Sequence, residues 1–198
     1  MLHHPRQKFE SLDQVAMEFR QGPGLDWALL RREKVGGLWN NAPRNLLTLS
    51  PGQWMEFAFH PLARHAEEVG WDIDVNDLIV KTKLIDYYHN IPKRFELENR
   101  IHTGVNVERV SPHDKGFLVE ARDVGDGTAR RFTCKYLVYA TGQRSVLRDL
   151  EVPGEELDWV TSHYDSPDDF PGQRVAVVGG GRSGDWAATE LHDAGKQV

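Results

Sequence analysis

The sequence predicts an α/β fold in which a parallel sheet carries an inserted β-hairpin or meander. Short apolar runs at 27–30, 136–140 and 174–178 have the length of buried strands, and the run at 136–140 lacks the polar alternation of a half-exposed strand. The run at 174–178 leads through a glycine-rich turn into a helical stretch. A Gly-Asp-Gly turn at 125–127 separates two strand-like segments and indicates an antiparallel hairpin.

Composition and charge place the chain among ordinary globular proteins. Of its 198 residues, 39% are hydrophobic and 27% are charged, which rules out disorder of the whole chain. The formal net charge of -6 argues against binding to nucleic acid. No apolar run is long enough to cross a bilayer, and the single cysteine, Cys134, excludes an internal disulfide or a CxxC motif. We therefore expect a cytoplasmic protein with neither a membrane nor a nucleic-acid partner.

The first thirty residues are expected to form a helix followed by a strand. Ser11 and Gln14 have the spacing of a capping box, and the apolar residues behind them predict a helix over about 12–21. The Gly-Pro-Gly triplet at 22–24 should end this helix. The apolar run at 27–30 then predicts a buried strand.

The next part of the chain is expected to be less regular. The glycine pair at 36–37 forces a turn. The segment 40–74 is rich in proline, asparagine and aromatic residues, so we expect mostly loop there, with one short helix near 60–69. Apolar residues on one stripe predict a helix over about 81–91, which Pro92 should kink or end.

The second half of the chain carries clear strand signals. Valines at 105, 107 and 110 predict a strand, and the segments 117–121 and 131–134 flank the Gly-Asp-Gly turn as the two strands of a hairpin. The acidic, proline-bearing segment 150–173 has the composition of a connector. We therefore expect one domain over residues 1–152 and the start of a second over 153–198.

The strongest local motif is the glycine-rich turn after the run 174–178. Gly179, Gly181 and Gly184 form a Gly-x-Gly-x-x-Gly pattern before a predicted helix over 185–194, which is typical of dinucleotide-binding βαβ units. The first glycine allows the tight turn, the second lets the backbone approach a pyrophosphate, and the third lets the helix pack close to the strand. The candidate nucleotide-binding residues are Gly179, Gly180, Gly181, Arg182, Ser183 and Gly184. The residue that separates NAD from NADP lies about twenty positions further on in such units, so this sequence does not choose between them.

Other chemically notable residues are expected to have structural roles. His60 and His65 are five apart, which is off one helical face, and no metal site is predicted. Ser183 is expected to be a phosphate-loop residue rather than a hydrolase nucleophile. Cys134 is expected in the core or on the hairpin.

A succession of motifs makes the chain resemble a known family. The stretch 31–39 ends in Val-Gly-Gly-Leu-Trp, Leu-Thr-Leu-Ser-Pro follows at 47–51, and a helix-to-strand piece covers 84–110. An Ala-Thr-Gly strand end at 140–142 and the segment 164–172 then lead into the glycine motif. From about residue 25 to the end of the sequence, this order is similar to that of the flavin-containing monooxygenase family, whose members bind two dinucleotides.

The resemblance implies an FAD- and NAD(P)-binding, Rossmann-like fold. Carried onto this chain, the residues that would face FAD are Glu33, Gly36, Gly37, Leu38, Trp39, Val107, Ala140, Thr141 and Gly142. NADPH would lie against the loop 179–184. The implied function is part of an NADPH-dependent flavin monooxygenase, in which a flavin C4a-hydroperoxide formed with O₂ passes oxygen to a small substrate containing nitrogen, sulfur or a carbonyl group.

Departures from the family pattern leave other interpretations open. The glycine motif expected before the first helix is missing, and His163 stands beside Tyr164, whereas the family places a histidine four residues before the tyrosine. We therefore expect a fragment that is truncated at both ends. One alternative is a flavin-dependent NAD(P)H reductase of the thioredoxin-reductase type, which needs a dithiol that one cysteine cannot form. The other is a catalytically incompetent nucleotide-binding remnant.

Overall fold

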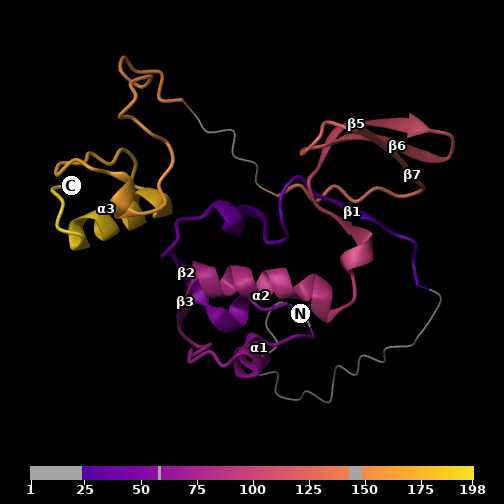
Figure 1. The fold of residues 1–198 in the computed structure, drawn as a ribbon, viewed down its shortest axis with the longest axis horizontal. Coiled ribbons are helices and arrows are strands. Elements are labelled where there is room, and N and C mark those ends of the chain that lie inside the picture. The colour runs from indigo at the N-terminus through magenta and orange to yellow at the C-terminus, as the bar shows by residue number, and fades with distance from the viewer. Residues whose placement is uncertain (1–23, 58, 143–148) are drawn as a thin grey trace.

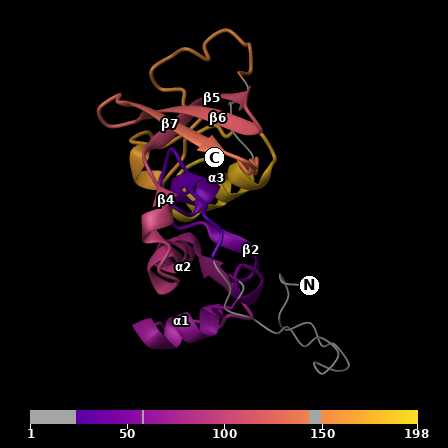
Figure 2. The same ribbon diagram turned by 90° about the vertical axis from the view of Figure 1, so that its right-hand side faces the viewer.

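The computed structural model describes residues 24–57, 59–142 and 149–198, so the helix predicted over 12–21 lies outside the described residues. The strands are β1 (Leu29–Leu30), β2 (Leu47–Pro51), β3 (Leu78–Val80), β4 (Ile101–His102), β5 (Val105–His113), β6 (Gly116–Asp123) and β7 (Ala129–Cys134). The helices are α1 (Leu62–Val69), α2 (Lys81–Arg94), α3 (Arg182–Asp193) and the 3-10 turns η2 (Gly37–Asn41), η3 (Gly52–Trp54), η4 (Glu98–Arg100) and η5 (Pro167–Asp169). Figures 1 and 2 show β5 to β7 at one end of the molecule and α1 toward the other. The chain has the mixed α/β architecture that its sequence predicts.

A short parallel pair links the beginning of the described chain to its middle. In β1 and β4, Leu29 lies opposite Ile101 and Leu30 opposite His102. The backbone N–H of Arg31 continues the pairing by donating to the His102 carbonyl at 2.9 Å. The strand predicted over 27–30 is thus confirmed at its last two residues, but the prediction that it is buried is wrong, because Leu29 is 41% exposed.

The meander β5-β6-β7 is antiparallel throughout. Val107 lies opposite Ala121, and Val119 lies opposite Phe132. Val105, Val119 and Ala121 are buried, because alternate side chains point to one face of the sheet. The predicted hairpin is confirmed, and the strand predicted from the valines at 105 to 110 continues to residue 113.

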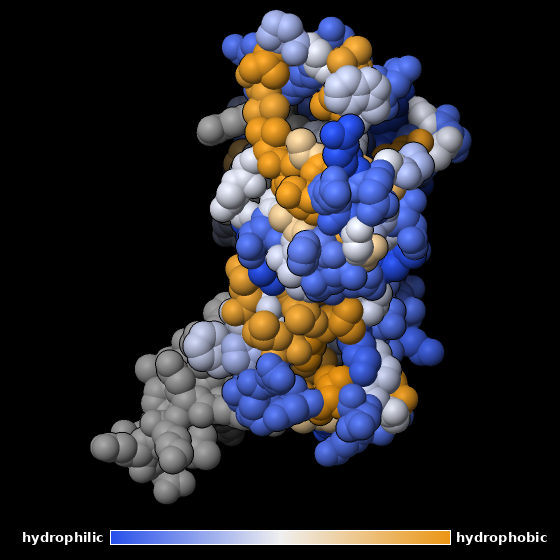
Figure 3. All heavy atoms as spheres, turned by 90° about the vertical axis from the view of Figure 1, so that its left-hand side faces the viewer, coloured by the Kyte–Doolittle hydropathy of each residue, from blue (hydrophilic) through white to orange (hydrophobic). Residues whose placement is uncertain are grey.

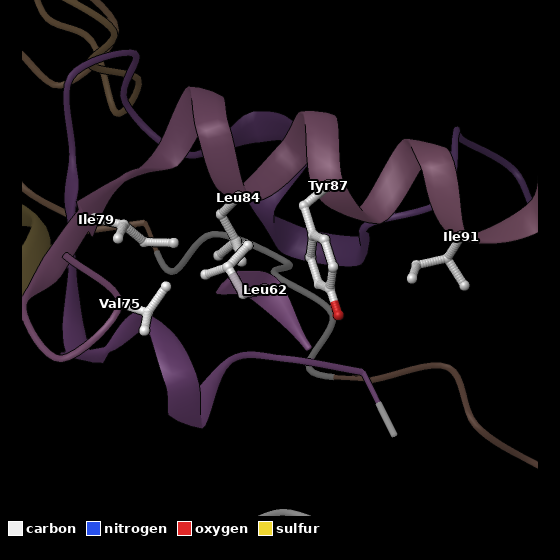
Figure 4. Packing of buried hydrophobic residues seen from close by; sticks show 6 residues of the cluster. All are labelled: Leu62, Val75, Ile79, Leu84, Tyr87 and Ile91. Carbon is white, nitrogen blue, oxygen red and sulfur yellow. The ribbon is translucent and has the colours of Figure 1, made fainter. Parts of the chain in front are cut away.

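The hydrophobic core lies between α1, α2, strand β3 and the segment that joins α1 to β3 (Figure 4). Three of its residues come from one face of α2, where spacings of three and four positions bring them together. Leu62 on α1 packs against this face. The cluster consists of Leu62, Val75, Ile79, Leu84, Tyr87 and Ile91.

Helix α2 runs three residues further than the sequence predicts. Pro92 lies inside the helix, which ends only at Arg94. A proline in the last turn removes a single helical hydrogen bond, so the helix tolerates it there. Within the described ranges, none of the helices, α2 included, has both the length and the apolar character needed to span a bilayer.

The segment predicted as mostly loop over 40–74 contains more structure than expected. Helix α1 is confirmed, but strand β2 and its antiparallel partner β3 are missing from the prediction. Buried Thr48 joins them: its hydroxyl oxygen accepts from the N–H of Ile79 at 3.1 Å and donates to the carbonyl of Ser50 at 2.7 Å. This pairing joins strands far apart in sequence, so no local pattern predicts it.

Two predicted strands of the parallel sheet are not formed as strands. The segment 136–140 has no ladder partner within the described ranges, and its Val138 and Tyr139 are 86% and 84% exposed. The segment 174–178 pairs only through a parallel bridge between Arg174 and Gln197. A strand needs a neighbour for its backbone groups, and an apolar sequence alone does not supply one. The bridge and α3 nevertheless give the strand–helix–strand order of a βαβ unit.

Candidate functional site

A cleft of about 3140 Å³ runs along β1, the glycine turn at 36–39, the meander and the start of α3. It exceeds the roughly 300–1,000 Å³ of pockets that hold drug-sized ligands, so it has room for a dinucleotide. Most of the residues predicted to bind cofactors line it: Glu33, Gly36, Gly37, Leu38, Trp39, Val107, Ala140, Thr141, Gly142, Arg182 and Ser183. The other four residues of the glycine loop lie outside its lining: Gly179, Gly180, Gly181 and Gly184.

The walls of the cleft include exposed apolar side chains. Leu38, Val107, Val138 and Tyr139 line it and remain exposed to solvent. Figure 3 shows patches of hydrophobic residues on one face of the molecule. Ligand pockets are lined mostly by apolar and aromatic side chains, so this composition suits a largely flat, aromatic ligand.

The glycine pair at 36–37 forms a sharp turn at one side of the cleft. Gly36 has a φ of 119° and Gly37 a φ of 61°, values that side chains disfavour. A Cβ at Gly36 would also lie 2.7 Å from the Cδ1 atom of Ile85 on α2. The sequence requires glycine here because the backbone turns against α2.

Asn40 braces this turn and is not among the residues predicted from the sequence. Its amide nitrogen donates to the carbonyls of Lys34 at 2.9 Å, of Val35 at 3.3 Å and of Gly37 at 3.1 Å. Its amide oxygen lies 3.0 Å from Nε2 of His89 on α2. An asparagine directly after Gly-Gly-Leu-Trp is the available signal, since asparagine side chains commonly cap turns.

Two charged residues that follow β1 line the cleft. Glu33 accepts a hydrogen bond from the side chain of Asn41 at 3.2 Å and pairs with Arg32 at 3.5 Å. Arg31 also lines the cleft, and its Nε atom is buried with no hydrogen-bond partner among the described residues. A buried donor without an acceptor is rare in folded proteins, so Arg31 offers a hydrogen bond that a ligand could take.

The loop 179–184 combines a tight turn with open space. A Cβ at Gly184 would collide with the carbonyl of Gly179, whose φ is 113°. No atom lies within 4 Å of a Cβ built at Gly181. Gly181 is also the N-cap of α3 and provides no side-chain cap. The first N–H groups of α3 therefore remain available to an anion, as in helix termini that bind phosphates.

Arg182 projects from this helix start into the cleft. Its guanidinium donates to the carbonyl of Leu47 at 3.2 Å, lies 3.6 Å from the Asp185 carboxylate and stacks over Trp186 at 5.4 Å. Its Nε atom is buried and has no partner in the described part of the chain. Arg182 thus presents a second unused donor at the cleft.

A hydrogen-bonded cluster around Glu190 ties α3 to the rest of the chain. The hydroxyl of Tyr164 donates to Glu190 at 2.8 Å, the indole of Trp186 at 3.0 Å and the side chain of Asn45 at 2.6 Å. Burial and the hydrogen bond to Glu190 raise the pKa of Tyr164, so the phenol remains a donor at neutral pH. The cluster therefore holds α3 beside the residues that lead into β2.

The remaining residues singled out from the sequence fall at different places. Cys134 ends β7, is partly exposed and lines the cleft. His163 and Tyr164 also line the cleft. His60 and His65 lie outside it and approach each other, because His60 precedes α1 and so is not bound by helical spacing.

Comparison with protein families gives one match over most of the chain. Residues 14–198 match the family described as pyridine nucleotide-disulphide oxidoreductase. Among curated proteins, the chain is 28% identical over 160 residues to the probable indole-3-pyruvate monooxygenase YUCCA9 of Arabidopsis thaliana. That alignment covers 78% of this chain and 35% of the plant protein. The chain thus spans about a third of the length of this relative.

Solved structures with the same fold include reductases and monooxygenases. Bacillithiol disulfide reductase Bdr from Bacillus cereus superimposes with a TM-score of 0.71 at 25% identity, covering 83% of this chain and 47% of the reductase. A cyclohexanone monooxygenase variant from Rhodococcus sp. Phi1, bound to NADP⁺, superimposes with a TM-score of 0.64. It is 22% identical, and the match covers 84% of this chain and 31% of the monooxygenase. At this identity the likeness shows the fold alone.

Proposed function

Because the chain belongs to the pyridine nucleotide-disulphide oxidoreductase family, we propose that it forms part of a flavin-dependent, NADPH-using monooxygenase. In this proposal FAD lies in the large cleft, and NADPH lies against the loop 179–184. The observation that carries it is that most residues predicted to face the cofactors, from Glu33 to Ser183, line one continuous cleft. Residues 1–152 belong to the FAD-binding part, and 153–198 begin the NADPH-binding part.

The cleft suits FAD in size and in its unused donors. Its volume of about 3140 Å³ exceeds what one dinucleotide needs. The buried Nε atoms of Arg31 and Arg182 lack protein acceptors in the described ranges, and phosphate oxygens are strong acceptors for guanidinium groups. Gly36 and Gly37 line the same cleft, and because they have no side chains a ligand can approach their backbone closely.

The start of α3 suits the pyrophosphate of NADPH. Its first N–H groups are not capped by a side chain, and the space beside Gly181 is open. The positive end of the helix dipole favours negative charge at this position. The uncapped helix start and the open space therefore support a nucleotide-binding role for Gly179 to Gly184.

FAD, when bound, supplies the electron transfer and the activation of O₂. The protein's own contribution is binding, orientation and exclusion of water. The exposed apolar side chains of Leu38, Val138 and Tyr139 line the cleft, where they can pack on a flavin and keep solvent away. The Glu190 cluster keeps α3, and with it the bound NADPH, beside the same cleft.

The substrate we propose is a small molecule with a nitrogen, sulfur or carbonyl centre that accepts one oxygen atom from O₂. The likeness to an indole-3-pyruvate monooxygenase favours this class of reaction. A flavin-dependent disulfide reductase is the second candidate, favoured by the likeness to bacillithiol disulfide reductase. The chain has only Cys134, so a dithiol relay of its own is excluded.

A spectroscopic titration of the purified chain tests the proposal. FAD is added first, the unbound fraction is removed, and NADPH is then added under air while O₂ consumption is followed. The proposal expects a retained flavin band that bleaches with NADPH and recovers as O₂ is consumed. A colourless protein after removal of unbound FAD would contradict it, and NADPH-driven reduction of a low-molecular-weight disulfide without O₂ consumption would favour the reductase.

A further inference from the structure

Three possible metal ligands meet beside α1, outside the lining of the large cleft. One ring nitrogen of His60, one of His65 and one carboxylate oxygen of Glu68 lie within 4.8 Å of one another. His65 and Glu68 are one turn apart on α1, whereas His60 precedes the helix. None of the three residues lines the cleft, so the proposed cofactor sites do not account for them.

His60 carries a buried nitrogen with no assigned role. The residue is 1% exposed, and its Nε2 atom has no hydrogen-bond partner in the described part of the chain. Native proteins rarely leave a buried polar group unsatisfied, because the hydrogen bond that it loses to water is not replaced. A ligand for this nitrogen would replace that hydrogen bond.

The two imidazole rings are held rigidly by their surroundings. The ring of His60 stacks on Tyr87 with centroids 5.6 Å apart, and it meets the ring of His65 edge-on at 5.5 Å. The hydroxyl of Tyr87 also donates to the backbone carbonyl of His60 at 2.6 Å. His65 is 3% exposed and packs against Trp71. Rigid rings need little reorganisation to coordinate an ion.

The charges around His60 partly offset one another. Arg64 and Arg94 add positive charge near His60, which opposes binding of a cation, and the carboxylate of Glu68 offsets it.

Glu68 supplies negative charge, and its exposed side chain can change conformation to reach an ion. It is exposed and pairs with Arg64 at 3.0 Å through one of its two carboxylate oxygens. An exposed ion pair of this kind contributes little to stability, so a metal ion can displace the guanidinium. A tetrahedral ion with bonds of about 2 Å sets its ligand atoms roughly 3.3 Å apart, so atoms that now lie within 4.8 Å of one another move closer on binding, and the exposed side chain of Glu68 is free to do so.

We propose that His60, His65 and Glu68 bind one Zn²⁺ ion, with water as the fourth ligand. Two imidazoles and one carboxylate form a ligand set that zinc takes in proteins, whereas calcium and magnesium prefer oxygen ligands alone. The ion connects the segment before α1 to the helix itself. Its binding gives the buried Nε2 atom of His60 a partner and stabilises the core around Tyr87.

The test is a calorimetric titration of Zn²⁺ alone into the metal-stripped full chain. The expected result is one equivalent bound and a higher melting temperature, since binding to the native state stabilises it. Glu68→Gln should weaken the binding by roughly tenfold or more and abolish the rise in melting temperature. The matched control is Glu67→Gln, which changes an exposed carboxylate on the same helix and should bind as the unmodified chain does. Co²⁺ in place of Zn²⁺ should give the visible absorption of a tetrahedral site.

Several results would overturn the proposal. One is a dissociation constant weaker than about 100 μM, and another is equal affinity in Glu68→Gln and Glu67→Gln. A third is loss of binding on substitution of His3 and His4 by asparagine, because the ion would then belong to the N-terminal histidines. His65→Asn serves as a second variant and should also weaken Zn²⁺ binding. If this buried substitution prevents folding, the result for Glu68→Gln decides the proposal, because Glu68 is exposed.

Discussion

Two glycine turns approach the proposed cofactors, and they are held in different ways. The turn at Gly36 and Gly37 is braced by side chains, because Asn40 bonds its carbonyls and Ile85 fills the space beside Gly36. The loop 179–184 is held by backbone packing, in which Gly184 lies against the carbonyl of Gly179. Gly180 and Gly181 have open space around an added Cβ and no positive φ, whereas Gly179 has open space but a φ of 113° that side chains disfavour. Glycines of one motif can therefore serve the fold or the ligand, and substitution can separate the two roles.

The largest effect is expected for Gly184→Ala. Its methyl group would meet a backbone carbonyl that cannot move without breaking the turn. We expect the strand–helix unit around α3 to lose about 3 kcal/mol of stability, as overpacking does. Hydrogen exchange of the α3 amides measures this loss, with Gly172→Ala as the control, since a methyl there makes ordinary contact. Equal exchange in the two variants would show that the turn is not held by this packing.

The second effect in size is expected for Gly36→Ala. The φ of 119° disfavours alanine, but the Ile85 atom in the way is the end of a flexible side chain. We expect a loss of about 2 kcal/mol in the free energy of unfolding. Urea denaturation measures it, and Gly24→Ala is the matched control because no atom lies within 4 Å of its added methyl. A variant as stable as that control would mean that the turn relaxes freely.

A smaller loss is expected for Asn40→Ala. Three carbonyls of the first turn would lose their side-chain donor. Because water can replace part of these hydrogen bonds, we expect a loss of about 1.5 kcal/mol. Asn41→Ala, which removes a single exposed hydrogen bond to Glu33, should cost less than about 0.5 kcal/mol. If both variants denature at the same urea concentration, Asn40 does not brace the turn.

The smallest effect on stability is expected for Gly181→Ala. The added methyl meets no atom within 4 Å, so the free energy of unfolding should change by less than about 0.5 kcal/mol. The affinity for NADPH should nevertheless fall roughly tenfold or more, because the methyl occupies the path of the pyrophosphate. A fluorescence titration with NADPH measures this. Unchanged affinity in a normally folded variant would remove the loop from the proposed nucleotide site.

The sequence predicts well those elements whose partners are close in the chain. The hairpin of β6 and β7, helix α1 and most of α2 follow from turn residues and periodicity alone. Strands β2 and β3 escape prediction because the contact between Thr48 and Ile79 joins distant segments. The apolar run at 136–140 predicts a strand, yet it has no partner within the described ranges. Apolar character shows that a segment can be buried, but it forms a strand only where a second strand supplies the hydrogen-bonding partners.

The candidate site divides in the same way. Gly36, Gly37 and the loop 179–184 were predictable, since glycine patterns mark backbone that must turn or be approached. Asn40 and Glu190 were not, because their roles depend on several hydrogen bonds to groups brought together by folding. The grouping of His60, His65 and Glu68 was not predictable either, because helical spacing does not apply to a residue before the helix.

The most direct test of the central claim is an equilibrium titration of FAD into the chain and into two variants. Ala140→Trp places a large side chain in the cleft, and Ala129→Trp places one at an exposed position outside it. The account predicts one FAD bound by the unmodified chain and by Ala129→Trp, and binding weakened roughly tenfold or more in Ala140→Trp. The absence of FAD binding by the unmodified chain, or equal binding by all three proteins, would contradict it.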